Sequence, residues 1–264
     1  MDMDDGDKLS LSMKTVAATV MVLIAAMLSY FQKLGMEKEM VYTSVRAIIQ
    51  LSIVGFVLEF IFIRRNVLWI LLAYLFMIVL AGRTAGKRAK HIPNGSYIAG
   101  ISILIGTSIT LFVLIMLNVF PFTSRYIIPI AGMMVGNAMT VTGVTMKKLR
   151  EDLKQQMDLV ETALALGATP RQAILQPVKR SVIIALSPVM DTAKTVGLIT
   201  IPGVMSGMIV GGASPLQAIQ MQIVVTNMLI GACTLSSILC AYLCWPAFIN
   251  NNFQLEYTVF AAAD

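Results

Sequence analysis

The fold of this protein is decided by residues 195–255, TVGLITIPGVMSGMIVGGASPLQAIQMQIVVTNMLIGACTLSSILCAYLCWPAFINNNFQL. This stretch contains 61 residues and not one acidic or basic side chain. The whole chain of 264 residues follows the same trend, since it is 57% hydrophobic and 13% charged, with a mean hydropathy of +0.80. A soluble domain of this length cannot bury so much apolar surface in one core. The composition therefore predicts an integral membrane protein and excludes a free cytosolic enzyme, a secreted disulfide scaffold and a disordered chain.

Apolar blocks long enough to cross a bilayer recur along the chain. A helix needs about 20 mostly apolar residues to span a hydrocarbon core of roughly 30 Å. We predict an all-α polytopic membrane protein with about seven transmembrane helices. Six or eight helices are the alternatives, because the stretch 181–249 can be divided into spans in more than one way. The glycine-rich segment 202–215 is either an external loop or a re-entrant segment. The transmembrane domain covers 15–249 between tails at 1–14 and 250–264, and its spans are 15–32, 40–63, 66–82, 97–120, 126–146, 182–201 and 216–244.

Basic residues are distributed unequally between the two sides that this division creates. With the N-terminus outside, segments 33–46, 83–91 and 147–180 face the cytoplasm and hold 14 of the 20 Lys and Arg residues. The opposite side holds five, and Lys194 falls within the sixth span. The positive-inside rule therefore predicts an outside N-terminus and a cytoplasmic C-terminus. The net charge of +6 reflects this topology and not a surface for nucleic acid, because the basic residues form no single stripe.

The longest polar segment is 147–180, KKLREDLKQQMDLVETALALGATPRQAILQPVKR. Apolar residues at helical spacing predict an amphipathic helix over 148–166. Gly167 is placed to end this helix, and Thr169 is placed to cap a second short helix whose first residue is Pro170. The alternative is an ordinary solvated loop between two spans. The sequence favours a helix, a glycine corner and a second helix on the cytoplasmic face.

The run Glu161-Thr162-Ala163, followed by Gly167-Ala168-Thr169-Pro170 and Gln172-Ala173, resembles the EAA loop of ABC transporter permeases. In that family the loop forms the coupling helix that docks on the ATP-binding subunit. The chain departs from the family pattern after this loop. The family usually has a Leu-Pro pair slightly further along, whereas in this chain the proline is Pro177 and it follows Gln176. The residues to which the resemblance assigns coupling are Glu161, Ala163, Gly167, Ala168, Thr169, Pro170 and Arg171.

No G-x-x-x-x-G-K-[ST] motif occurs in the chain, so it cannot cradle nucleotide phosphates in the P-loop manner. The resemblance therefore implies a permease without enzymatic activity or a cofactor of its own. ATP and Mg would belong to a separate nucleotide-binding partner. It also implies a second copy of this chain, because one chain of this size makes half a pore in such systems.

Further blocks resemble one small permease family over about residues 15–250, namely the family of the bacterial Fet-type iron exporter and the plant aluminium-sensitivity permease (sensitive to aluminium rhizotoxicity). Blocks similar to the plant branch are SYFQKLG at 29–35, AGMMVGNAMTVTGVTMK at 131–147 and LVETALALGATPRQA at 159–173. The resemblance implies a half-type ABC permease in aluminium tolerance, with UDP-glucose as substrate, in the plasma membrane or a vacuolar or vesicular membrane of a plant cell. The alternatives are export of iron or aluminium, free or chelated, an ion-coupled carrier without an ATPase partner, and a non-transporting scaffold.

Polar residues inside the spans are the candidates for the substrate path, because an ionisable side chain is costly to keep in a membrane. A structural ion pair between Asp191 and Lys194 is the alternative to a role in binding, and Arg46 and Glu59 are near enough to span ends to reach interfacial water. A path for UDP-glucose should offer cations or helix N-termini, whereas a cation path should offer carboxylates. The candidates, which leave this choice open, are Arg46, Gln50, Glu59, Asn137, Asp191 and Lys194.

The fifth span also carries Gly132, Gly136 and Gly143, whose spacing favours close helix packing, including a contact between two copies. The chain holds 19 methionines, but thioethers suit soft metals and not aluminium or ferric iron. Its three cysteines lie at helical spacing in one apolar stretch, which is typical of packing residues. No Cys and His residues have metal-ligand spacing, so the sequence predicts no metal site.

Overall fold

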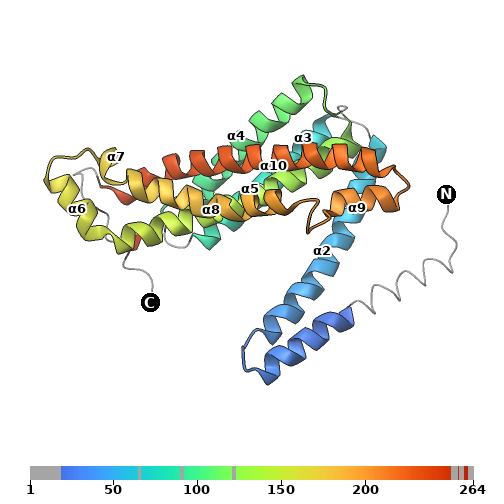
Figure 1. The fold of residues 1–264 in the computed structure, drawn as a ribbon, viewed down its shortest axis with the longest axis horizontal. Coiled ribbons are helices and arrows are strands. Elements are labelled where there is room, and N and C mark those ends of the chain that lie inside the picture. The colour runs from blue at the N-terminus through green and yellow to red at the C-terminus, as the bar shows by residue number, and fades with distance from the viewer. Residues whose placement is uncertain are drawn as a thin grey trace. The chain divides into compact units, whose positions relative to one another are not determined.

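The computed structural model describes residues 19–64, 67–89, 92–120, 123–250, 255 and 259–260 (Figure 1). The chain divides into two compact units, residues 1–64 and 65–264. Apart from two isolated bridges, all regular secondary structure of the described residues is helical. The predicted all-α class is confirmed.

The first unit is a helical hairpin. A short apolar helix spans Thr19–Phe31, and α2 spans Glu37–Arg64 after a turn in which Gly35 has a φ of 71°. Only 6% of the most apolar stretch of α2 is buried, so its side chains are suited to contact with lipid. The second predicted span, 40–63, lies within α2, whereas the first, 15–32, begins outside the described residues.

The second unit holds the remaining helices. Its long members are α3 (Val67–Arg88), α4 (Gly95–Met116), α5 (Ser124–Gln155), α8 (Leu175–Thr195) and α10 (Pro215–Cys244). The short ones are α6 (Met157–Ala165), α7 (Pro170–Ala173), α9 (Gly203–Val210) and the 3₁₀ helix η1 (Trp245–Phe248). Figure 1 shows α5, α8 and α10 side by side along the unit, α10 also packs against α4, and α3 packs against α4 and α5.

Small residues allow these helices to approach closely. A Cβ built on Gly82 in α3 would lie 2.8 Å from the Cα of Gly100 in α4. On the other side of α4, a Cβ on Gly106 would lie 2.7 Å from the backbone N of Ser236 in α10. Both distances are shorter than real Cβ contacts, so the two helix pairs require glycine at these positions.

Hydroxyl groups link the buried faces of the bundle. Tyr74 Oη in α3 lies 2.6 Å from Thr107 Oγ1 and 3.0 Å from Ser108 Oγ in α4. Thr145 Oγ1 in α5 lies 2.8 Å from Ser237 Oγ in α10. Side-chain hydrogen bonds of this kind satisfy polar atoms that lipid cannot, and they fix the register of neighbouring helices.

Among the described residues, five helices are long and apolar enough to cross a membrane: Glu37–Ile61, Val67–Arg88, Gly95–Met116, Tyr126–Gln155 and Pro215–Phe248. They correspond to the second, third, fourth, fifth and seventh predicted spans. The other two predicted spans, the first and the sixth, are not among the five. The helix Thr19–Phe31 is shorter than a span, and α8 has two charged residues toward each of its ends. The count of seven and the orientation therefore stay predictions.

Three segments differ from the boundaries that the sequence predicted. Helix α5 continues to Gln155 instead of ending at 146, so the helix predicted over 148–166 is the end of α5 followed, after Gln156, by α6. Helix α8 begins at Leu175, continues through Pro188 and ends at Thr195, whereas the predicted span was 182–201. The segment 202–215 contains the helix α9.

Candidate functional site

The segment between α5 and α8 folds as a helix, a glycine corner and a second helix, as predicted. Gly167 has a φ of +88°, in the left-handed region where a side chain is strained. The Gly167 N–H donates to Leu164 O at 3.0 Å and the Ala168 N–H donates to Ala163 O at 3.0 Å, which is the Schellman pattern of helix ends. The glycine therefore closes α6 and reverses the chain.

The helix after the corner is fixed by a capping box. The Gln172 N–H donates to Thr169 Oγ1 at 3.4 Å, and the Thr169 N–H donates to Gln172 Oε1 at 3.0 Å. Pro170 occupies the first helical position, where its missing N–H costs nothing. The predicted Thr-Pro start is confirmed, and the reciprocal bond from Gln172 completes it.

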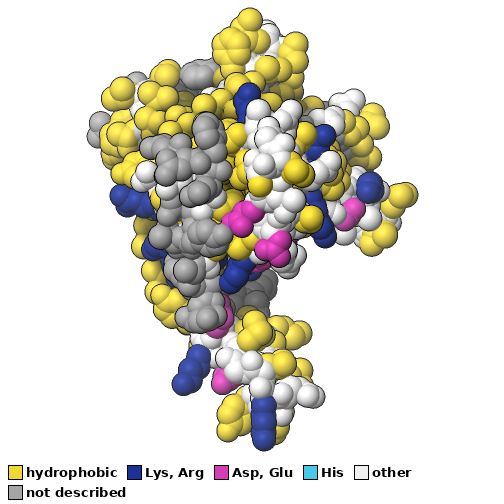
Figure 2. All heavy atoms as spheres, turned by 90° about the vertical axis from the view of Figure 1, so that its left-hand side faces the viewer, with side chains coloured by type: hydrophobic (Ala, Val, Ile, Leu, Met, Phe, Trp, Pro, Cys, Tyr) yellow, Lys and Arg dark blue, Asp and Glu magenta, His cyan; other side chains and the backbone are white. Residues whose placement is uncertain are grey.

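The corner presents a mixed surface to its surroundings. Leu159 and Leu166 are 69% and 83% exposed, and Thr169 and Arg171 are exposed beside them. Figure 2 views the end of the second unit that carries α6 and α7, where Lys, Arg, Asp and Glu side chains gather among hydrophobic ones. The corner therefore exposes both apolar and charged side chains.

Buried residues hold this corner on the bundle. Val160 in α6 and Ile174 after α7 are 2% and 1% exposed, and both belong to one core with Leu153 of α5. The core also includes Phe248 and, from the C-terminal segment, Leu255, Val259 and Phe260.

Polar contacts add to this bracing. Arg150 Nε donates to Val259 O at 3.0 Å, and Phe248 and Phe260 stack with ring centroids 5.8 Å apart. Arg180 Nε of α8 lies 3.8 Å from Asp152 Oδ2 of α5, whose side chain is 8% exposed. The end of α5, the start of α8 and the described residues Leu255, Val259 and Phe260 thus pack together as the base of the corner.

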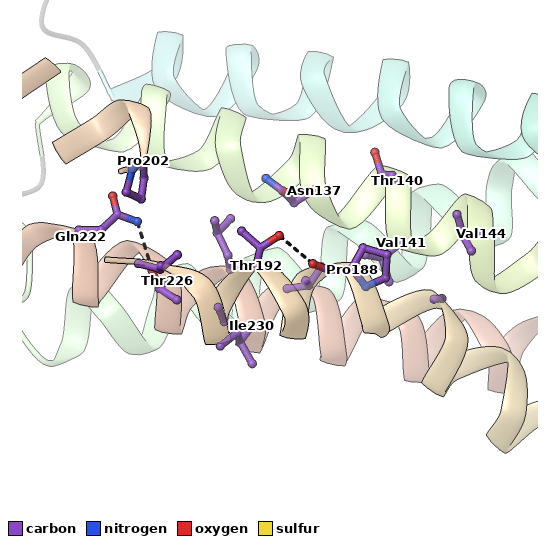
Figure 3. Close-up of a pocket in the computed structure, with 15 residues that line it drawn as sticks. Asn137, Thr140, Val141, Val144, Pro188, Thr192, Pro202, Gln222, Thr226 and Ile230 are labelled. Atoms are coloured by element: carbon purple, nitrogen blue, oxygen red, sulfur yellow. Dashed lines mark hydrogen bonds between the residues drawn. The ribbon is translucent and has the colours of Figure 1, made fainter. Parts of the chain in front are cut away.

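A cleft of about 280 Å³ lies between α5, α8 and α10 (Figure 3). Its lining includes no ionisable side chain, and its polar groups are amides and hydroxyls. Figure 3 shows Gln222 and Thr226 of α10 near Pro202 at one end, and Val144 of α5 at the other. The polar lining residues are Asn137, Thr140, Thr192, Gln222 and Thr226.

The structure brings only one of the predicted path residues to this cleft. Asn137 lies in its wall, with Nδ2 donating to Met133 O at 2.9 Å. Asp191 and Lys194 do not line it; Lys194 Nζ donates to Asp191 Oδ1 at 3.2 Å, and both side chains are more than half exposed. The alternative of a structural pair thus describes their geometry. Arg46, Gln50 and Glu59 are exposed residues of α2 in the other unit.

The three glycines of α5 have unequal surroundings. A Cβ on Gly143 would lie 3.3 Å from Arg88 Cδ, and one on Gly132 would lie 3.6 Å from Met77 Sδ, so both face α3. A Cβ on Gly136 would meet nothing within 4 Å. Gly136 is the member of the set that leaves room for a further contact.

Gln222 is the cleft residue that sequence reasoning missed. Its side chain is 7% exposed, its Nε2 donates to Thr226 Oγ1 at 3.2 Å, and its Oε1 is buried without a hydrogen-bond partner in the described structure. The only signal in the sequence is a neutral amide within the apolar span 216–244, and Gln217, Gln220 and Asn227 in the same span share it.

Comparison with known proteins gives one family match that spans both the corner and the cleft. The family model described as "Uncharacterised protein family (UPF0014)" matches residues 12–249. The chain belongs to the UPF0014 family. The match covers both the corner at 156–174 and all residues that line the cleft.

Three relatives are similar over nearly their whole length. Protein ALUMINUM SENSITIVE 3 of Arabidopsis thaliana is 65% identical, over 94% of this chain and 91% of its own. The UPF0014 membrane protein STAR2 of Oryza sativa subsp. japonica is 66% identical, over 95% of this chain and 88% of its own. The probable iron export permease protein FetB of Escherichia coli is 41% identical, over 91% of this chain and 93% of its own. No solved structure gives a significant match. The family resemblance predicted from the sequence is confirmed.

Proposed function

We propose that this chain is the membrane permease subunit of an ABC-type transporter, that it works as a pair of copies with a separate ATP-binding subunit, and that it carries UDP-glucose in aluminium tolerance. The observation on which the proposal rests is the corner at 156–174. It is an exposed short helix held in one geometry by the Gly167 turn and the Thr169 capping box. Such an element can transmit a rigid-body movement from a partner to the bundle, because its base is buried on α5 and α8.

In this proposal the corner faces the cytoplasm and docks on the ATP-binding subunit through the surface around Leu166 and Arg171, with Glu161 and Ala163 in the helix below. ATP and Mg are bound by the partner. The open space at Gly136 is available for the second copy of the chain. The protein resides in the plasma membrane or in a vacuolar or vesicular membrane of a plant cell.

Two observations favour a sugar nucleotide over a metal ion. The polar groups in the mostly aliphatic lining of the α5–α8–α10 cleft are amides and hydroxyls, which suit the sugar part of such a solute, and its diphosphate would lie outside the cleft. Within the described part of the chain, no three His, Cys, Asp or Glu side chains are grouped so that they could hold a metal ion. Metal export is nevertheless the second candidate, because the relative FetB is named a probable iron export permease.

The test is ATP-dependent flux of labelled UDP-glucose into proteoliposomes that contain this chain and its candidate ATP-binding subunit. We expect saturable flux that requires both proteins and ATP. Flux by this chain alone, driven by an ion gradient, would instead favour an ion-coupled carrier. ATP hydrolysis that is stimulated by iron or aluminium chelates, without UDP-glucose flux, would favour metal export. Complex formation without flux of any solute would favour a scaffold.

A further inference from the structure

The cleft between α5, α8 and α10 has the chemistry of a site for a neutral, hydroxyl-bearing group. Its polar groups are two amides, at Asn137 and Gln222, and three hydroxyls. None of them ionises, so the cleft offers no ion pair to a phosphate and no carboxylate to a metal. The remaining lining is aliphatic, from side chains such as Val141, Val189 and Ile230.

Gln222 supplies the observation that points to a ligand. More than nine-tenths of its side chain is buried, and it lies in the cleft wall with Nε2 committed to Thr226 Oγ1. Its Oε1 has no partner within the described structure. A buried carbonyl oxygen without a donor is unfavourable and is normally satisfied by protein, water or ligand. Rotation of the amide would leave its NH₂ group unpaired instead, and a hydroxyl, which donates and accepts, satisfies either orientation.

The size of the cleft limits what it can hold. A volume of about 280 Å³ lies just below the usual range for ligand pockets, roughly 300–1,000 Å³. A complete sugar nucleotide with its charged diphosphate does not match this volume or this neutral lining. A single pyranose ring does, because its C–H faces match the aliphatic walls and its hydroxyl edge matches the amides and hydroxyls.

We propose that the α5–α8–α10 cleft binds an uncharged pyranose ring and that Gln222 is its recognition residue, hydrogen-bonded to a ring hydroxyl. The inference rests on the proposed function, since it assigns the cleft to the glucose moiety of the solute. The diphosphate and base then lie outside the cleft. Methyl glucoside alone should therefore compete for the site, whereas UDP should compete weakly.

The experiment measures equilibrium binding of labelled UDP-glucose to the purified chain in lipid nanodiscs, with methyl glucoside and UDP as competitors. The variant is Gln222→Met, which keeps the length of the side chain and removes both amide groups. The matched control is Gln220→Met, at an exposed glutamine of the same helix that does not line the cleft. We expect Gln222→Met to weaken binding about tenfold, the usual effect of removing one buried hydrogen bond, and Gln220→Met to leave it unchanged.

A second variant keeps the test independent of folding at Gln222. Thr140 is exposed and lines the cleft, so Thr140→Phe should fill the space without disturbing the core and should abolish competition by methyl glucoside. Unchanged binding in both variants, with ATP-dependent flux of UDP-glucose intact, would overturn this assignment and leave the proposed function standing. Absence of any glucoside binding to the parent chain would overturn it as well. Absence of coupled ATP hydrolysis and flux, with methyl glucoside still bound through Gln222, would overturn the proposed function alone.

Discussion

Substitution of Gly167 by valine should uncouple ATP hydrolysis from transport while leaving the bundle folded. The φ of +88° at this position lies where a side chain is strained, and nothing lies within 4 Å of a Cβ built there. The cost is therefore conformational and not a steric clash with neighbours. It amounts to about 1–2 kcal/mol for an ordinary residue, which lowers the ratio of native to non-native conformations of the corner by a factor of roughly 5–30.

The assay compares substrate-stimulated ATP hydrolysis and binding of the ATP-binding subunit across a series at this position. Asparagine tolerates the left-handed conformation better than alanine or valine, so activity should fall in the order Gly, Asn, Ala, Val. Gly55→Ala in α2, a helical position with open space around its Cβ, serves as the control and should retain full activity. If a folded Gly167→Val variant hydrolyses ATP and binds the ATP-binding subunit as the parent chain does, the role assigned to the corner is refuted.

Three further predictions concern stability and charge. Gly106→Ala should clash with the backbone of Ser236 and lower the unfolding temperature in detergent by about 2–10 °C, whereas Gly207→Ala, which meets open space in α9, should not. Equal melting of the two variants would contradict the α4–α10 packing. The double variant Asp191→Lys/Lys194→Asp, which swaps the two charges, should change neither the unfolding temperature nor UDP-glucose flux, because the pair is exposed and outside the cleft. Loss of flux with normal folding would show that the pair belongs to the substrate path. Phe260→Ala should destabilise the base of the corner by about 3–5 kcal/mol and increase proteolysis around Gln156; unchanged proteolysis would mean that this base does not depend on Phe260.

The parts of the fold that the sequence predicts well are those set by local chemistry. Gly167, Thr169 and Pro170 act within a few residues of themselves, so the corner can be inferred from their spacing. The end of α5 is different, because no helix breaker lies between 146 and Gln155, and hydropathy marks the membrane boundary and not the end of the helix. Lys147 and Lys148 both pair with Glu151 and support the continued helix.

Contacts between helices are harder to infer. Gly82 and Gly100 belong to different helices, and their meeting is a property of the packed bundle that neither local pattern contains. The same holds for the cleft, which gathers neutral side chains from three helices. Polarity within the spans pointed to Asn137, which lines the cleft, and to Asp191 and Lys194, which pair with each other. It did not point to Gln222, because only the fold shows that the side-chain oxygen of Gln222 is buried and unpaired.

The hydrogen bond from Arg150 to Val259 joins residues 109 positions apart in the chain. At about 5–20 residues per second, the ribosome needs roughly 5–20 s to make the intervening stretch. During that interval the corner has emerged but its base lacks Leu255, Val259 and Phe260. A nascent chain therefore cannot present the finished corner, and assembly with a partner that recognises it has to wait until synthesis has passed residue 260.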